Sequence, residues 1–199
     1  GINYIDTAPV YGIGSSETLL GEALKGRRDH FILQTKCSLN WRNEGGNFHY
    51  ERDGFTVNND TRPAAIRKDV EDSLTRLQTD HLDVLVVHYV CPSWPVQETM
   101  DALNQLIQEG KIRAIALSNS QPEDLDEYQK YGTIAAVQEQ FSLLQPQHGL
   151  EYFDTCRKYG TAFQGYGILE EGFLTSPDYA DRKFPDGDVR KTMPWTEDP

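Results

Sequence analysis

Side chains that can give, take or hold protons stand at or just past the ends of several short apolar runs in this sequence. These residues are Asp6, Tyr11, Lys36 and His88. A carboxylate, a phenol, an amine and an imidazole together form a set suited to acid–base chemistry. Each residue type alone is more often structural, so the prediction of a site depends on their shared position after successive runs.

The apolar runs predict the elements that must position these side chains. We expect strands over Ile2–Ile5, Phe31–Thr35, Leu82–Val87, Ile112–Leu117, Ile134–Val137 and Thr161–Tyr166. Most of the runs are continuous rather than alternating, as is typical of strands buried on both faces of a parallel sheet. The carboxyl ends of parallel strands meet at one edge, where barrel enzymes gather their active sites.

Segments with a helical period separate the strands. One apolar stripe combines Ile66, Val70, Leu74 and Leu77, and a second combines Met100, Leu103, Leu106 and Ile107. First helical turns are expected at Pro63, Pro95 and Pro122, and Ser120 with Glu123 has capping-box spacing. The repeated alternation of strands and helices predicts a parallel α/β fold. Periodicity alone does not distinguish a closed barrel from an open sheet. No GxGxxG follows a strand, which disfavours the open dinucleotide-binding sheet.

The segment 37–62 is polar but carries Trp41, Phe48 and Tyr50. We predict a long loop that serves as a lid or substrate wall, because loops of this length usually have a function. A mobile insertion is the alternative interpretation.

Composition excludes several classes of function. The net charge of −12 disfavours nucleic acids and anionic membranes, both of which need a basic face. No apolar run approaches the ~20 residues that span a bilayer. Cys37, Cys91 and Cys156 are widely spaced and predict reduced thiols in a cytoplasmic protein. The histidines lack metal-ligand spacing, so no metal is expected.

The motifs at the strand ends resemble the aldo-keto reductase family. The resemblance rests on the runs 6–12, 14–17, 35–36, 82–89, 110–119, 137–138, 166–169 and 184–190. It implies a (β/α)₈ TIM barrel, represented here by about six βα units within a single domain, 1–199. The chain is therefore expected to be truncated at both ends. The segment after Lys36 and the run 184–190 most resemble bacterial members of the general-stress and inositol-catabolism type.

The resemblance implies hydride transfer between a reduced nicotinamide and the carbonyl of an aldehyde, ketone or sugar. Tyr11 would be the general acid, and the Lys36 ammonium would lower the pKa of Tyr11 from its ordinary value of about 10. Asp6, buried beside Lys36, would keep that ammonium in place. His88 would orient the carbonyl and help to move the proton.

The resemblance also assigns residues to the cofactor and the substrate. The expected cofactor-binding residues are Ser118, Asn119, Gln138, Tyr166 and Leu169. The first three would hold the carboxamide and Tyr166 would stack on the nicotinamide ring. NADPH is expected and NADH stays open, because the family's basic segment for the 2′-phosphate is absent. Trp41 and Tyr89 would line the substrate pocket.

Two other functions stay open at this point. One is a cofactor-binding regulatory subunit, like the channel β-subunits that share this fold, and the other is an inactive fragment. The joint presence of the four acid–base residues favours an enzyme. Residues 1–199 by themselves are expected to aggregate without turnover, because the first and last strands would be open edges. The oligomeric state is left open.

Overall fold

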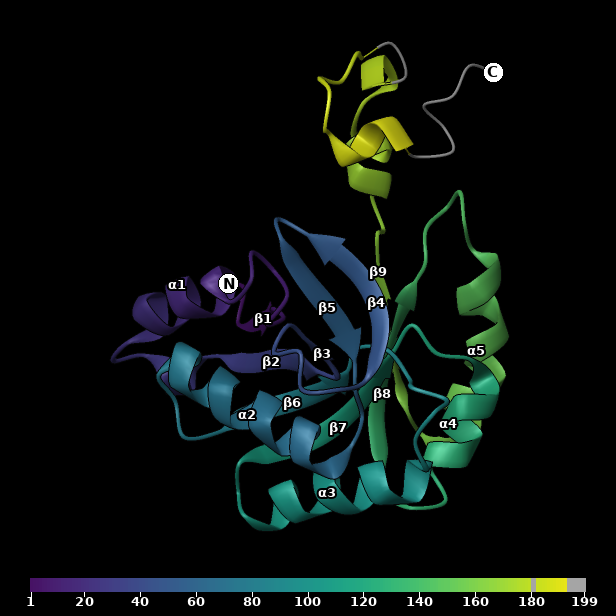
Figure 1. Ribbon diagram of the computed structural model, residues 1–199. Helices are drawn as coiled ribbons and strands as arrows, with labels where there is room; N and C mark the ends of the chain where they lie inside the picture. The colour runs from purple at the N-terminus through teal and green to yellow at the C-terminus, as the bar shows by residue number, and fades with distance from the viewer. Residues whose placement is uncertain (180–181, 193–199) are drawn as a thin grey trace.

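The computed structural model describes residues 1–179 and 182–192 of the chain (Figure 1). The strands are β1 (Tyr4–Asp6), β2 (Ile32–Cys37), β3 (Leu39–Asn40), β4 (Asn47–Arg52), β5 (Phe55–Asn59), β6 (Leu82–Val87), β7 (Ile112–Ser118), β8 (Ile134–Gln140) and β9 (Ala162–Tyr166). The α-helices are α1 (Ser15–Leu24), α2 (Pro63–Leu77), α3 (Val96–Gln108), α4 (Pro122–Tyr128) and α5 (Gln147–Tyr159). Short 3₁₀ helices span Arg28–His30, Glu170–Thr175, Pro177–Tyr179 and Val189–Thr192.

Six strands form one parallel sheet in the order β1-β2-β6-β7-β8-β9. The sheet curls as part of a barrel, and α1 to α5 follow one another around its outer side (Figure 1). All six strands predicted from the apolar runs are present, and the prediction of a parallel α/β barrel fold is confirmed. The sheet edges are β1 and β9, as expected. That residues 1–199 aggregate by themselves stays a prediction.

The main hydrophobic core lies between the sheet and the helices. Leu33 and Leu85 of the strands and Leu103 of α3 are fully buried members of it. The concave face of the sheet carries a small apolar cluster on β6, β7 and β8, and polar side chains on β1, β2 and β9. There the Gln164 amide donates to the Tyr4 hydroxyl at 3.0 Å, and the Gln34 amide donates to Gln164 at 3.1 Å. These bonds join β1 and β2 to β9 across the inside of the curl.

The predicted ends of two strands shift in the structure. β1 begins at Tyr4, and Ile2 is 89% exposed because it precedes the first residue paired with β2. β8 continues to Gln140, since its polar carboxyl end pairs with β9 up to Tyr166. Apolar runs mark the buried middle of a strand, whereas backbone pairing continues into residues that face the site.

Two of the three predicted proline starts are correct. Pro63 and Pro122 are the first residues of α2 and α4, whereas Pro95 is the N-cap residue of α3. The predicted capping role of Ser120 is wrong.

The α4 start is capped one residue further along the chain. The Asp124 carboxylate accepts the Gln121 backbone N–H at 2.8 Å. Ser120 is buried and bonded elsewhere, so it is not available as the cap.

The segment 37–62 is not the loop that we predicted. It forms an antiparallel sheet in the order β3-β5-β4, joined by a turn at Asp53 and Gly54 with φ of 52° and 79°. An Asp-Gly pair with both residues at positive φ makes the two-residue turn that matches the twist of a hairpin. Val57 of β5 is buried together with Leu39, so the hairpin is packed onto the molecule.

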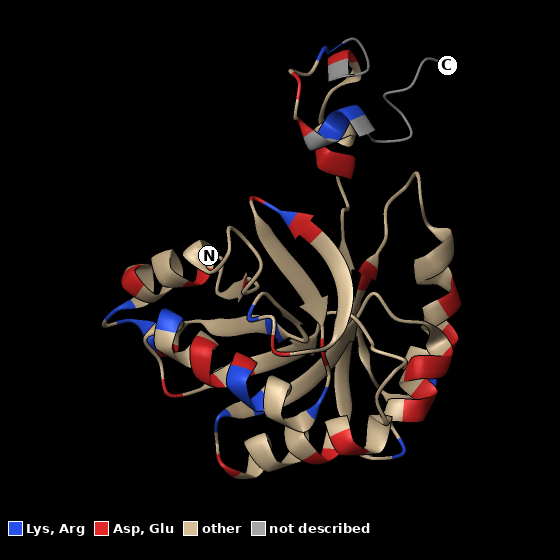
Figure 2. Ribbon diagram, viewed as in Figure 1, with Lys and Arg blue, Asp and Glu red and all other residues tan. Residues whose placement is uncertain are grey.

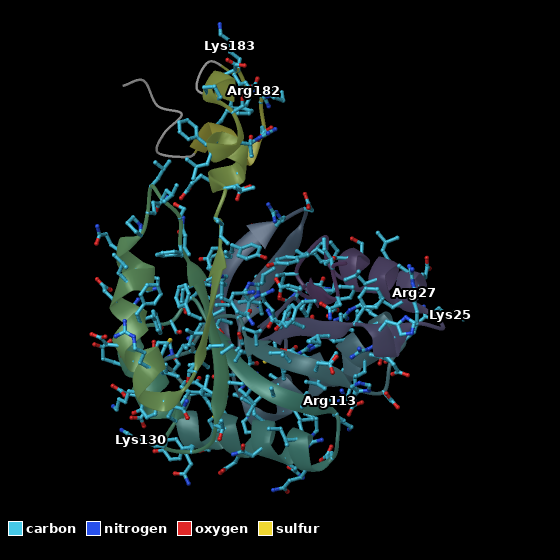
Figure 3. All side chains as sticks on the ribbon, turned by 180° about the vertical axis from the view of Figure 1, so that it is seen from behind. Lys25, Arg27, Arg113, Lys130, Arg182 and Lys183 are labelled. Carbon is cyan, nitrogen blue, oxygen red and sulfur yellow. The ribbon has the colours of Figure 1, made fainter. Side chains whose placement is uncertain are left out.

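Charged residues are distributed unevenly over the outer helices. Acidic and basic residues alternate on α2, whereas the charged residues of α4 are all acidic (Figure 2). The α5 helix carries Glu151 and Asp154 together with Arg157 and Lys158. Seen from behind, the basic residues Lys25, Arg27, Arg113 and Lys130 lie scattered around the periphery (Figure 3). No helix among residues 1–179 and 182–192 has the length and apolarity to cross a membrane.

Candidate active site

The structure brings the predicted residues to the carboxyl edge of the parallel sheet. Asp6 ends β1, Lys36 lies one residue before the end of β2, and His88 directly follows β6. Ser118 ends β7 and Tyr166 ends β9. Because all six strands run parallel, these positions lie along one edge and face the inside of the curl.

Lys36 and Asp6 form an ion pair at the β1–β2 end of this edge. The Lys36 ammonium is 1% exposed and donates to both Asp6 carboxylate oxygens, at 2.8 and 2.9 Å, and to the Thr7 carbonyl at 2.8 Å. Burial lowers the pKa of Lys36, and the Asp6 carboxylate counteracts that shift. Asp6 itself is not buried as predicted: its side chain is 34% exposed, because β1 is an edge strand.

Tyr11 differs from the prediction in its ionisation. The Lys36 ammonium lies 5.0 Å from the centroid of the Tyr11 ring, and its three hydrogen bonds go to Asp6 and Thr7. Burial, followed by the negative charge of Asp6, raises the pKa of Tyr11 to about 12. The predicted lowering by Lys36 is therefore wrong, because burial and the Asp6 carboxylate dominate. The phenol is protonated at neutral pH.

His88 is a neutral imidazole beside Tyr11. Its ring centroid is 6.1 Å from that of Tyr11, with the two planes at 84°. Burial, with smaller contributions from the Lys36 charge and from His49, lowers the pKa of His88 to about 3. Its Nδ1 atom is buried without a hydrogen-bond partner among the described residues.

Ser118 and Asn119 form a tight turn between β7 and α4. Asn119 has a φ of 49°, a left-handed conformation that asparagine adopts more readily than most residues. Its amide donates to the His88 carbonyl at 2.9 Å, and its oxygen accepts from the Tyr166 hydroxyl at 2.7 Å. The Ser118 hydroxyl donates to the Gln138 carbonyl at 2.7 Å. The turn thus connects β6, β7, β8 and β9.

A buried carboxylate that the sequence analysis missed holds this turn from behind. Glu139 is 1% exposed and accepts from the Ser120 N–H at 3.1 Å and from the Ser120 hydroxyl at 2.9 Å. His148 Nε2 lies 3.1 Å from the other carboxylate oxygen, and Ser120 also shares a hydrogen bond with the Tyr152 hydroxyl at 2.7 Å. Burial raises the pKa of Glu139, against the hydrogen bonds from Ser120.

Two cavities open at this edge of the sheet. The first, of about 440 Å³, is lined by Val10, Tyr11, Leu39, His49, Tyr50, Glu51, Arg52, His88 and Tyr89. The second, of about 480 Å³, is lined by Asn119, Ser120, Gln121, Glu139, Gln140, Leu144, Gln145, Gln147, His148 and Tyr166. Tyr11 and His88 therefore line one cavity, and Asn119 and Tyr166 line another.

The structure separates the two residues predicted for the substrate pocket. Tyr89 lines the cavity with Tyr11 and His88, but Trp41 lines a different cavity of about 280 Å³ beside Arg42 and Asp69. The reason is that Trp41 follows β3 and packs toward α2, where the Arg76 guanidinium lies 5.7 Å from its ring. The hairpin supplies His49 and Tyr50 to the first cavity instead. The Asp53-Gly54 turn is the sequence signal that would have identified that hairpin.

Leu169, predicted to touch the cofactor, lies in the turn after β9. It is 55% exposed, and its carbonyl accepts from the Gly172 and Leu174 N–H groups. The following Glu170 is 2% exposed, and its carboxylate accepts from the Ser142 hydroxyl.

The sequence of the chain is similar to a protein-family profile and to two bacterial reductases. The Aldo/keto reductase family profile matches residues 1–198. The NADH-specific methylglyoxal reductase of Escherichia coli K12 is 37% identical over 199 residues, which are 98% of this chain and 60% of that protein. An aldo-keto reductase of Bacillus subtilis 168 is 34% identical over 201 residues, 100% of this chain and 57% of the relative.

A solved structure is also similar to this chain in both fold and sequence. The glycerol dehydrogenase of Gluconobacter oxydans superposes with a TM-score of 0.89 at 35% identity, covering 100% of this chain and 59% of the other. The chain thus spans about three fifths of the length of these relatives. Because the family profile matches residues 1–198, the chain belongs to the aldo/keto reductase family.

Proposed function

We propose that the protein carrying this chain reduces aldehyde or ketone carbonyls with NAD(P)H, or oxidises the corresponding alcohols or sugars. One observation carries the proposal: a protonated phenol, a buried lysine paired with a partly exposed aspartate, and a neutral imidazole gather at the carboxyl edge of one parallel sheet. We also infer a reducing, cytoplasmic location, which suits three buried free cysteines.

The chemistry of the neighbouring turn suits a nicotinamide cofactor. Tyr166 is 38% exposed and its hydroxyl donates to Asn119, which follows Ser118 in the turn. The Ser118 hydroxyl in turn donates to the Gln138 carbonyl. A flat ring beside amide and hydroxyl groups matches a nicotinamide and its carboxamide. Leu169 would contact the phosphates. When bound, the cofactor supplies the hydride.

The side chains of this chain would handle the proton. Tyr11 donates its phenolic hydrogen to the carbonyl oxygen, because a phenol with a raised pKa stays protonated at the operating pH. His88 is neutral and donates its imidazole N–H to the same oxygen, which orients the carbonyl. Asp6 holds the Lys36 ammonium next to the Tyr11 ring, where its charge favours negative charge that develops on the phenol oxygen.

The cofactor preference is a separate question. The Escherichia coli relative is named NADH-specific. An aldo/keto reductase of Klebsiella pneumoniae, 27% identical with a TM-score of 0.72 over 92% of this chain and 59% of that protein, is solved with NADP. We propose NADPH as the cofactor, with NADH as the competing outcome. Titration of the purified protein with each cofactor, followed by turnover of an aldehyde, tests both. Tight binding without turnover would favour a regulatory subunit.

The pH dependence of reduction is expected to be flat from about pH 5 to about pH 9. His88 is neutral above about pH 3, and Tyr11 keeps its proton until the pH approaches about 12. The rate should therefore fall only in strongly alkaline solution, as Tyr11 loses its proton. The measurement is kcat/KM for the carbonyl at saturating cofactor. A break near neutrality would contradict the assignment of these two residues.

Truncation of Tyr166 is expected to weaken cofactor binding. Tyr166→Ala should cost about 1–3 kcal/mol, the scale of other base–aromatic stacking. Tyr166→Phe keeps the ring but leaves the Asn119 oxygen without its 2.7 Å donor, so we expect a smaller loss rather than none. Fluorescence titration with NADPH measures both. Binding by the alanine variant that matches the wild type would exclude stacking.

A further inference from the structure

The β4–β5 hairpin forms one wall of the cavity that holds Tyr11 and His88. His49 and Tyr50 come from β4, and the His49 ring lies 4.5 Å from that of Tyr89 and 5.4 Å from that of Tyr50. The wall is anchored to the molecule, because Val57 is buried behind it and the Asn59 amide donates to the Val90 carbonyl at 3.2 Å. It is therefore a built part of the cavity.

The wall points hydrogen-bonding groups into the cavity without pairing them. Tyr11, Tyr50 and Tyr89 line the same cavity. Burial raises the pKa of Tyr50 and of Tyr89, and Tyr11 adds to the rise in both. None of the three makes a hydrogen bond to another residue within 1–179 or 182–192, and neither does the His49 ring. These groups remain available to a ligand in the cavity.

The charge and apolar content of the cavity narrow the class of ligand. Glu51 and Arg52 both line it, so it holds one charge of each sign and favours neither anions nor cations. Aliphatic side chains come only from Val10 and Leu39 among its lining residues. A purely apolar aldehyde would displace water from the hydroxyls and leave them unpaired, which is costly. A neutral, hydroxylated molecule would pair with them.

We propose that Tyr50 and His49 are specificity-determining residues that select short carbonyl substrates with hydroxyl groups next to the carbonyl. The inference rests on the proposed function, since it places the substrate carbonyl between Tyr11 and His88. Tyr50 would donate to, or accept from, a substrate hydroxyl, and His49 would hold the Tyr50 and Tyr89 rings while offering a second polar contact.

The test compares two aldehydes with the same carbon skeleton, glyceraldehyde and propanal, with kcat/KM corrected for the hydrated fraction of each. The wild type should prefer glyceraldehyde by about tenfold or more, the scale of one or two hydrogen bonds. Tyr50→Phe keeps the ring and removes its hydroxyl, and His49→Phe replaces the imidazole by an aromatic ring without polar atoms. Each should lower this preference about threefold to tenfold. Tyr159→Phe, whose hydroxyl bonds Asp126 on the outer helices, is the control and should keep the wild-type preference.

The outcomes separate this inference from the proposed function. Equal reduction of both aldehydes by the wild type, or an unchanged preference in folded Tyr50→Phe and His49→Phe proteins, would overturn the specificity role and leave the reductase assignment standing. Reduction of neither aldehyde with NADPH or NADH would overturn both. Thermal unfolding of each variant checks that it is folded. If a variant does not fold, the preference of the wild type for glyceraldehyde over propanal still tests the inference.

Discussion

Replacement of Tyr11 by phenylalanine is expected to lower kcat for carbonyl reduction by about 10²- to 10⁴-fold, the contribution of a positioned general acid. The change removes only the phenolic oxygen, and the ring can keep its place 5.0 Å from the Lys36 ammonium. Cofactor affinity should hardly change, since Tyr11 lines the cavity of about 440 Å³ while Tyr166 and Asn119 line the other. Single-turnover kinetics at saturating cofactor measure the effect.

A matched variant controls for the loss of a tyrosine hydroxyl. Tyr159→Phe removes a hydroxyl that bonds Asp126, away from the candidate site, and should retain wild-type kcat. Near-normal turnover by Tyr11→Phe would show that another group is the general acid. His88 would be the first candidate, although its pKa of about 3 makes it a poor proton donor at neutral pH.

Replacement of Arg42 by methionine is expected to destabilise the protein by about 3–5 kcal/mol, because it leaves a buried carboxylate without its cation. Arg42 Nη2 lies 2.7 Å from Asp69, whose side chain is 2% exposed and also accepts the Ser38 N–H at 2.8 Å. This contact fastens the start of the β3–β5 segment to α2. Urea denaturation measures the loss. Arg157→Met, which breaks an exposed pair with Asp154, is the control and should change stability little.

The size of this loss should depend on pH. Burial raises the pKa of Asp69 to about 7, above its unfolded value of 3.8. Between these values the folded protein binds a proton that the unfolded chain does not, so this group's contribution to stability falls as the pH rises through that window. In Arg42→Met a proton can replace the missing cation at low pH. The loss should therefore be smaller at about pH 5 than at about pH 8, and a loss equal at both pH values would count against the ion pair.

The β4–β5 hairpin shows why the order of residues along the chain was not enough to predict which side chains line the cavity that holds Tyr11 and His88. His49 and Tyr50 occur in a polar segment without apolar periodicity, and nothing in their spacing relates them to Tyr11 or His88. They reach the same cavity because the Asp53-Gly54 turn pairs β4 with β5 and the hairpin then folds onto the sheet. Trp41 belongs to the same segment but lines a different cavity, beside Arg42 and Asp69.

The sequence by itself determined the parallel strands, the helices between them and the placement of Asp6, Tyr11, Lys36 and His88 after successive strands. These follow from local apolar periodicity, and parallel strands necessarily bring their carboxyl ends to one edge. Only the tertiary structure decided the protonation of Tyr11, the identity of the substrate wall and the Glu139 support behind the Ser118-Asn119 turn. Those properties depend on burial and on distances between residues far apart in the chain, because solvation and electrostatic interactions are set by packing in space rather than by order along the chain.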